Sequence, residues 1–147
     1  MALVEDAPNK DITYKIIGVA MEVHNELGPG HREEVYQRAM ALKFPQEPHC
    51  LSFEEECELP IFNDDGQLVY VYRVDFRVEQ LVLAEIKTHH QPLNQDEIAQ
   101  VFDYFAASDC QVALLINFGR PRLEFKRLFP PRHIQTRRHW GQRIQSG

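Results

Sequence analysis

The chain has 147 residues, of which 44% are hydrophobic and 26% charged, a composition typical of one soluble globular domain. It excludes a collagen-like or intrinsically disordered chain, and no apolar run approaches the ~20 residues that a membrane-spanning helix requires. The N-terminal residues lack the basic-then-apolar pattern of a secretory signal, so we expect a cytoplasmic protein without membrane contacts. Three cysteines that form no CxxC pair indicate neither a structural zinc site nor a disulfide framework.

Charge is divided unevenly along the chain. The net charge is −6, but residues 120–147 carry eight Lys and Arg against one acid, a net of +7, which leaves −13 on residues 1–119. This asymmetry indicates an acidic body with a basic segment that either contacts phosphate groups or forms a solvated tail. We therefore expect one domain over residues 1–128 and a basic C-terminal arm, which can be flexible, over residues 129–147.

Three segments have apolar residues at helical spacing. The first is predicted to begin at a cap at Asn9 or Asp11 and to end at Gly28-Pro29-Gly30. The second ends before Pro45, and the third begins at Asn94, a residue suited to the N-cap. The predicted helices cover about residues 12–27, 31–43 and 94–105.

Five segments are predicted as strands. In the first, Leu51, Phe53, Cys57 and Leu59 have the same parity, which places them on one face. Asn63-Asp64-Asp65-Gly66 then predicts a tight turn to a hairpin partner. The strands are expected at about residues 51–62, 68–78, 81–87, 111–117 and 123–128. The order of helix, helix, three strands, helix and two strands predicts an α/β fold with a mixed sheet flanked by helices.

Three polar residues interrupt the apolar strands. Glu85 and Lys87 are two residues apart and share one face of their strand, and Asp75 comes close to Glu85 if the two strands are neighbours. Two adjacent carboxylates repel unless a cation lies between them or one stays protonated, and hard oxygen ligands suit Mg²⁺ or Mn²⁺. The alternative is a solvated cross-strand ion pair, which contributes less than ~1 kcal/mol to stability.

Two helical pairs are candidates for the same site. Gln100 and Tyr104 are four residues apart and point the same way from the third helix. Glu33 and Tyr36 are three residues apart on the second helix. Taken singly, each pair is also consistent with an ordinary polar helix face.

The combined motifs resemble a known family. Leu27-Gly28-Pro29-Gly30 followed by Glu33 and Tyr36 is similar to the signature of the GxxExxY family, a branch of the PD-(D/E)XK nuclease superfamily. The other matching features follow in the family's order: Asp75, Glu85-Ile86-Lys87, the QxxxY motif Gln100-xxx-Tyr104, and Asn117-Phe118-Gly119. The resemblance spans about residues 12–128 and implies a restriction-endonuclease-like fold with an αβββαβ core.

The resemblance also implies a metal centre. Asp75, Glu85 and the backbone carbonyl of Ile86 would hold Mg²⁺ or Mn²⁺, and Glu33 would complete the site directly or through water. Lys87 would position the attacking water and stabilise charge on the phosphate.

Substrate contacts are expected at several further positions, for Arg120 and Arg122 because they lie close to the turn after Asn117. Gln100 and Tyr104 would orient the substrate or the bound water, and Tyr36, Arg120 and Arg122 are candidates for contact with the substrate. The implied activity is metal-dependent hydrolysis of nucleic acid, DNA above all. A non-cleaving nucleic-acid-binding module and a protein-interaction domain on the same fold are the alternatives. Because one site cuts one strand, cutting both strands at once would require a homodimer.

Overall fold

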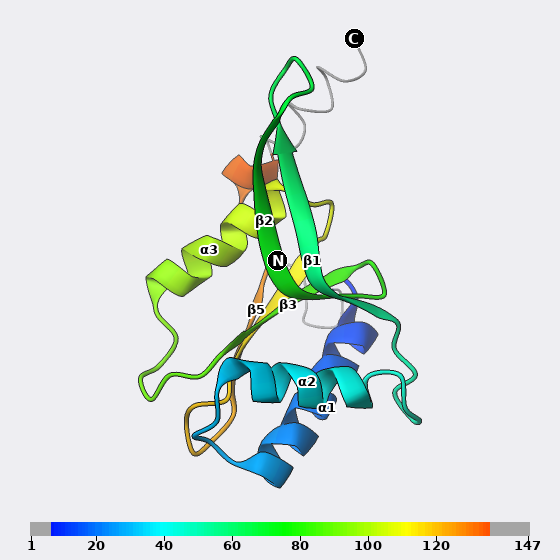
Figure 1. Cartoon of the computed structure of the whole chain (residues 1–147), viewed down its shortest axis with the longest axis vertical. Coiled ribbons are helices and arrows are strands. Elements are labelled where there is room, and N and C mark those ends of the chain that lie inside the picture. The colour runs from blue at the N-terminus through cyan, green and yellow to red at the C-terminus, as the bar shows by residue number, and fades with distance from the viewer. Residues whose placement is uncertain (1–6, 136–147) are drawn as a thin grey trace.

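The computed structural model describes residues 7–135, which fold into a mixed sheet with helices on both faces (Figure 1). The elements are α1 (Lys10–Leu27), α2 (Glu33–Lys43), β1 (Phe53–Phe62), β2 (Leu68–Val78), β3 (Val82–Lys87), α3 (Gln95–Ala106), β4 (Val112–Asn117) and β5 (Glu124–Leu128). The strands lie in the order β1-β2-β3-β4-β5, and only β3 and β4 are parallel among these neighbours. The predicted order of elements and the α/β class with the restriction-endonuclease-like core are confirmed.

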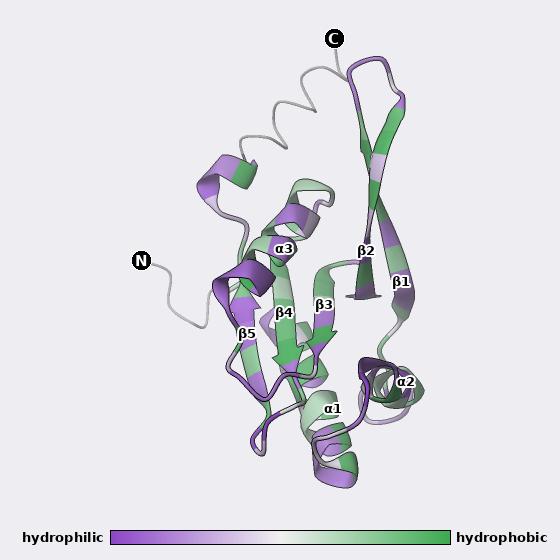
Figure 2. Cartoon of the chain, turned by 60° about the vertical axis from the view of Figure 1, so that its left-hand side comes forward, coloured by the Kyte–Doolittle hydropathy of each residue, from purple (hydrophilic) through white to green (hydrophobic). Residues whose placement is uncertain are grey.

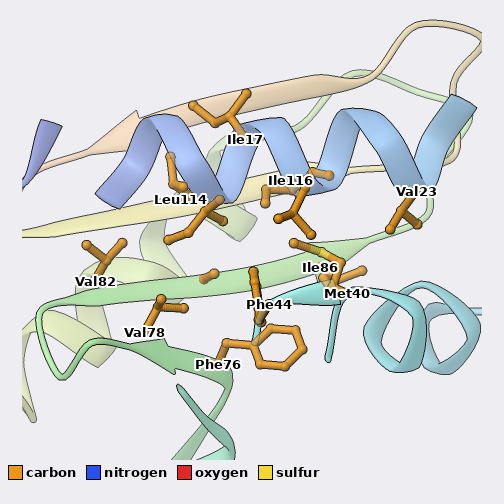
Figure 3. Packing of buried hydrophobic residues seen from close by; sticks show 14 of the residues in the cluster. Ile17, Val23, Met40, Phe44, Phe76, Val78, Val82, Ile86, Leu114 and Ile116 are labelled. Atoms are coloured by element: carbon orange, nitrogen blue, oxygen red, sulfur yellow. The ribbon is translucent and has the colours of Figure 1, made fainter. Parts of the chain in front are cut away.

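Two apolar clusters lie on opposite faces of the sheet. The helices α1 and α2 cover one face, where Ile17, Val23 and Met40 pack toward side chains of the central strands (Figure 3). Helix α3 covers the other face and contributes Val101 and Phe105 to the second cluster. Because β3 and β4 are sandwiched between the two layers, their apolar residues are buried on both faces.

The ends of the helices follow their local sequence. Gly28 ends α1 with a φ of +67°, a conformation that glycine adopts without a Cβ clash. Asn94 caps α3 as predicted: its side chain accepts from the Glu97 amide, while the Glu97 carboxylate accepts from the Asn94 amide. No helix in the described residues is long and apolar enough to cross a bilayer.

The apolar residues of β1 do not all lie on one face of the sheet, although their alternation in sequence predicted that they would. Phe53 packs in the cluster under α1 and α2, whereas Cys57 and Leu59 pack in the cluster under α3. Between them, Glu56 has a φ of +52°, which breaks the regular pleat and reorients the side chains that follow. The β1–β2 hairpin therefore contributes side chains to both apolar clusters, and it extends beyond the rest of the sheet (Figure 2).

Packing against the domain continues past residue 128, the boundary predicted for the basic arm. Residues 132–135 form a helical turn, and Ile134 is 1% exposed within the apolar cluster under α3. The start of the predicted arm is thus packed against the domain, because the apolar side chain of Ile134 is buried in the core. Residues 136–147, the remainder of that arm, lie outside the described residues.

Candidate active site

The candidate site lies where the pairing of β2 with β3 stops. The regular register runs from Val78↔Val82 to Phe76↔Ala84, and Asp75 and Glu85 come next on the two strands. At this point carboxylates replace backbone acceptors: Glu85 Oε1 accepts from the Asp75 amide at 3.0 Å, and Asp75 Oδ2 accepts from the Ile86 amide at 2.8 Å. These exchanged contacts hold the two acidic side chains side by side.

Burial and proximity make this pair of carboxylates electrostatically unfavourable. Glu85 is 6% exposed. Burial, and then the negative charge of Glu85, raise the pKa of Asp75 to about 8. The protein without a bound cation therefore keeps a proton on the pair at neutral pH, and a divalent cation would compensate the same repulsion.

Helix α3 supports β3 through two matched contacts. The Tyr104 hydroxyl donates to Glu85 Oε2 at 2.7 Å, and Lys87 Nζ donates to Gln100 Oε1 at 3.2 Å. Four residues rise by about 6 Å along a helix, and two residues rise by about 6.6 Å along a strand. Because α3 runs antiparallel to β3, Gln100 and Tyr104 can therefore face Lys87 and Glu85 at the same time. Burial and the Glu85 carboxylate raise the pKa of Tyr104, which keeps its hydroxyl a donor.

Glu33 lies at the first position of α2 and faces the same region. Burial raises the pKa of its carboxyl group, with Lys87 opposing this shift and Asp75 adding to it. Among residues 7–135, no group of three or more His, Cys, Asp and Glu side chains is arranged to hold a metal ion. Glu33 is thus an electrostatic neighbour of the Asp75–Glu85 pair and does not form a three-carboxylate cluster with it.

Tyr36, for which a contact with substrate is predicted, lies in the core and supports the site from there. Its side chain is fully buried, its ring stacks on Phe118 with centroids 4.5 Å apart, and its hydroxyl donates to the Gly28 carbonyl at 2.5 Å. The same hydroxyl accepts from the His31 amide at 3.2 Å. Tyr36 therefore fixes the loop that leads from α1 into Glu33.

Asn117 and Gly119 hold the loop after β3, a role that the sequence alone did not reveal. Asn117 is fully buried, accepts from the amides of His89 and Gly119, and donates to the carbonyls of His89 and Gln91. A Cβ at Gly119 would lie 2.5 Å from the His89 amide nitrogen, so this close approach requires glycine. Parallel pairing of Lys87 with Asn117 brings both residues to one edge of the sheet, which a single sequence does not state.

Arg120 and Arg122 lie in the turn that joins β4 to β5, beyond the strand end that pairs with Lys87. Arg120 is 4.0 Å from Glu124, and its carbonyl contacts His24 Nε2 at 2.9 Å. Arg122 is exposed. Contact of these two arginines with a substrate stays a prediction.

The donor set fits a small divalent cation. Mg²⁺ is commonly bound by one or two carboxylates together with water, and Asp75 and Glu85 supply two carboxylates in a partly dehydrated position. Neither a thiol nor an imidazole is needed, which matches the preference of Mg²⁺ and Mn²⁺ for hard oxygen ligands.

The chain is similar in sequence to a known family of proteins. A family model described as the PD-(D/E)XK nuclease superfamily matches residues 10–128. No curated protein matches the chain. One solved structure, "Crystal structure of SSO0001", is 16% identical with a TM-score of 0.49, and the match covers 78% of this chain but only 58% of that one. The family match includes every element from α1 to β5, and the chain belongs to the PD-(D/E)XK nuclease superfamily.

Proposed function

We propose that this protein is a divalent-metal-dependent nuclease that hydrolyses phosphodiester bonds of DNA. The observation that carries the proposal is the pairing of Asp75 with Glu85 beside Lys87, at the break between β2 and β3. Membership in a nuclease superfamily supports a nucleic-acid substrate. The GxxExxY signature and the QxxxY motif support placement in the GxxExxY branch of that superfamily.

The carboxylates of the site would bind the cation. Asp75, Glu85 and the Ile86 carbonyl would hold the cation, with Glu33 contributing through water. When bound, Mg²⁺ or Mn²⁺ would supply Lewis acidity toward a phosphate oxygen. Glu85 is kept in its orientation by the Tyr104 hydroxyl, which leaves it as a fixed carboxylate ligand.

Lys87 provides the positive charge that the reaction needs next to the carboxylates. Its ammonium group, held by Gln100, orients the attacking water and stabilises the negative charge that develops on the phosphate. The water loses a proton to solvent as its oxygen bonds to phosphorus, the bond from phosphorus to the 3′ oxygen breaks, and that oxygen takes up a proton from solvent. The products are a 5′-phosphate and a 3′-hydroxyl.

The experiment is cleavage of fluorescently labelled single- and double-stranded DNA by purified protein in Mg²⁺ or Mn²⁺, with EDTA and RNA as comparisons. Lys87→Ala should abolish cleavage without abolishing Mn²⁺ binding, and Glu85→Gln should abolish both. Lys126→Ala, on β5, is the matched lysine control and should cleave like the wild type.

Three outcomes distinguish the alternatives. DNA binding that is strong, salt-sensitive and independent of metal, without cleavage, would replace the nuclease by a non-catalytic nucleic-acid-binding module. Absence of DNA binding and of Mn²⁺ binding in the folded protein would leave the protein-interaction domain. Cleavage that survives in both Glu85→Gln and Lys87→Ala would place the reaction elsewhere in the chain.

A further inference from the structure

His89 lies at the rim of the candidate site and has no role in the reaction described so far. It follows β3 by two residues, and its side chain is 43% exposed. Its ring is close enough to Glu33 to interact electrostatically with that carboxylate, as Lys87 does. His89 thus adds a second basic side chain to the rim on which a phosphate would approach.

The backbone and the ring of His89 are both held in place. Asn117 Oδ1 accepts from the His89 amide at 2.9 Å, and Asn117 Nδ2 donates to the His89 carbonyl at 3.1 Å. The ring Nε2 contacts Glu97 Oε2, and the side chain of Glu97 is 10% exposed. The other oxygen of Glu97 accepts from the Asn94 amide, so Glu97 is itself anchored to the start of α3.

This arrangement leaves one ring nitrogen for a ligand. Within residues 7–135, no hydrogen bond involves Nδ1 of His89. Because the Glu97 carboxylate only accepts, Nε2 of His89 carries a hydrogen, and in the imidazolium form the ring has a second N–H at Nδ1 for another acceptor. A half-exposed, oriented donor beside Lys87 is suited to an oxygen of a phosphate group.

We propose that His89 is a substrate-binding residue whose Nδ1–H donates to a non-bridging oxygen of the DNA phosphodiester, with Glu97 as the residue that orients it. This inference rests on the proposed nuclease function. It assigns a phosphate-binding position that the carboxylate and lysine motifs do not contain.

Two substitutions at His89 separate phosphate binding from a structural role. The amide nitrogen of asparagine is bonded to Cγ and replaces Nδ1, whereas that of glutamine extends one bond further and replaces Nε2. His89→Gln therefore keeps the contact with Glu97 and loses the phosphate donor, and His89→Asn does the reverse. His90→Gln, at the exposed neighbouring histidine, is the matched control.

The measurement is the Kd of labelled DNA by fluorescence anisotropy, with Ca²⁺ in place of Mg²⁺ to limit cleavage, beside the thermal midpoint of each variant. His89→Gln should bind DNA about tenfold or more weakly at unchanged thermal stability, as expected for loss of a charge-assisted hydrogen bond. His89→Asn should lose thermal stability yet bind DNA more tightly than His89→Gln, and His90→Gln should match the wild type in both measurements.

Wild-type affinity in His89→Gln, or weaker binding by His89→Asn than by His89→Gln, would overturn the inference and leave the nuclease proposal intact, provided that the wild type binds and cleaves DNA. If the wild type neither binds nor cleaves DNA in Mg²⁺ or Mn²⁺, the nuclease proposal and the role of His89 are overturned together.

Discussion

The hydroxyl of Tyr104 donates a hydrogen bond of 2.7 Å to Glu85, and this contact joins the centre of the sheet to the helix that covers it. Glu85 is a carboxylate with 6% exposure, and its other oxygen accepts from the Asp75 amide. A buried carboxylate is costly unless its oxygens are hydrogen-bonded, so the Tyr104 contact offsets the cost of placing the Glu85 carboxylate inside the protein.

Tyr104→Phe should weaken both stability and catalysis. The substitution leaves one oxygen of Glu85 without its donor, which should lower the free energy of unfolding by about 2 kcal/mol and DNA cleavage by about tenfold. Chemical denaturation and single-turnover cleavage would measure the two effects. Tyr72→Phe is the control, because its ring lies 6.0 Å from that of Tyr104 and no hydrogen bond of its hydroxyl occurs in the described residues.

Asp75→Asn should make the metal-free protein more stable at alkaline pH. In the unfolded chain Asp75 loses its proton near pH 4, whereas in the folded protein its pKa is raised to about 8 by burial and by Glu85. The folded state therefore binds more protons between these values, and wild-type stability falls as the pH rises from about 4 to about 8. Asparagine has no such proton to lose.

Thermal midpoints in EDTA at pH 5 to pH 8 test this reasoning. The gain of Asp75→Asn over the wild type should grow with pH and reach about 5 °C or more at pH 8. Added Mn²⁺ should stabilise the wild type and not the variant. Asp64→Asn, at the exposed hairpin turn, should show no pH-dependent gain. A gain for Asp75→Asn that is equal at all pH values would contradict the predicted repulsion.

Tyr36→Phe should affect folding and leave substrate affinity unchanged. The variant loses the hydroxyl that links Gly28 and His31, which should cost about 1–2 kcal/mol of unfolding free energy. The KM for DNA should stay within about twofold of the wild type, because a fully buried ring does not reach the substrate. A large rise in KM at unchanged stability would instead restore the role of Tyr36 in substrate binding.

Gly119→Ala should destabilise the fold strongly. The added methyl group would lie 2.5 Å from the His89 amide nitrogen and 2.6 Å from the His89 carbonyl oxygen, both of which are backbone atoms that cannot rotate away. We expect a loss of about 3 kcal/mol or more, measured by denaturant titration. Gly18→Ala in α1 meets nothing within 4 Å and should stabilise the protein by about 0.5–1 kcal/mol. Equal effects of the two substitutions would contradict the close packing at Gly119.

Periodicity predicted each helix and strand from α1 to β5, because the local pattern of each segment agrees with its final burial, but it did not predict the helical turn at residues 132–135. It failed within β1, where Phe53 and Cys57 have one parity but pack on opposite faces, since the positive φ of Glu56 has no clear sequence signal. The pairing of Glu85 with Asp75 followed from strand adjacency. The burial of Tyr36 and the hydrogen bonds of Asn117 depend on segments that are far away in the sequence. The spacing of residues along one chain does not predict such contacts.

The most direct test of the central claim is a Mn²⁺ titration followed at once by the electron paramagnetic resonance signal of free Mn²⁺ and by the rate of DNA cleavage. The account predicts that binding and cleavage saturate over the same range of Mn²⁺ concentration in the wild type, and that Glu85→Gln abolishes both. Glu79→Gln, on the turn that follows β2, should leave both curves unchanged. Cleavage that proceeds at full rate in Glu85→Gln, or in the wild type with EDTA, would contradict a metal centre at Asp75 and Glu85.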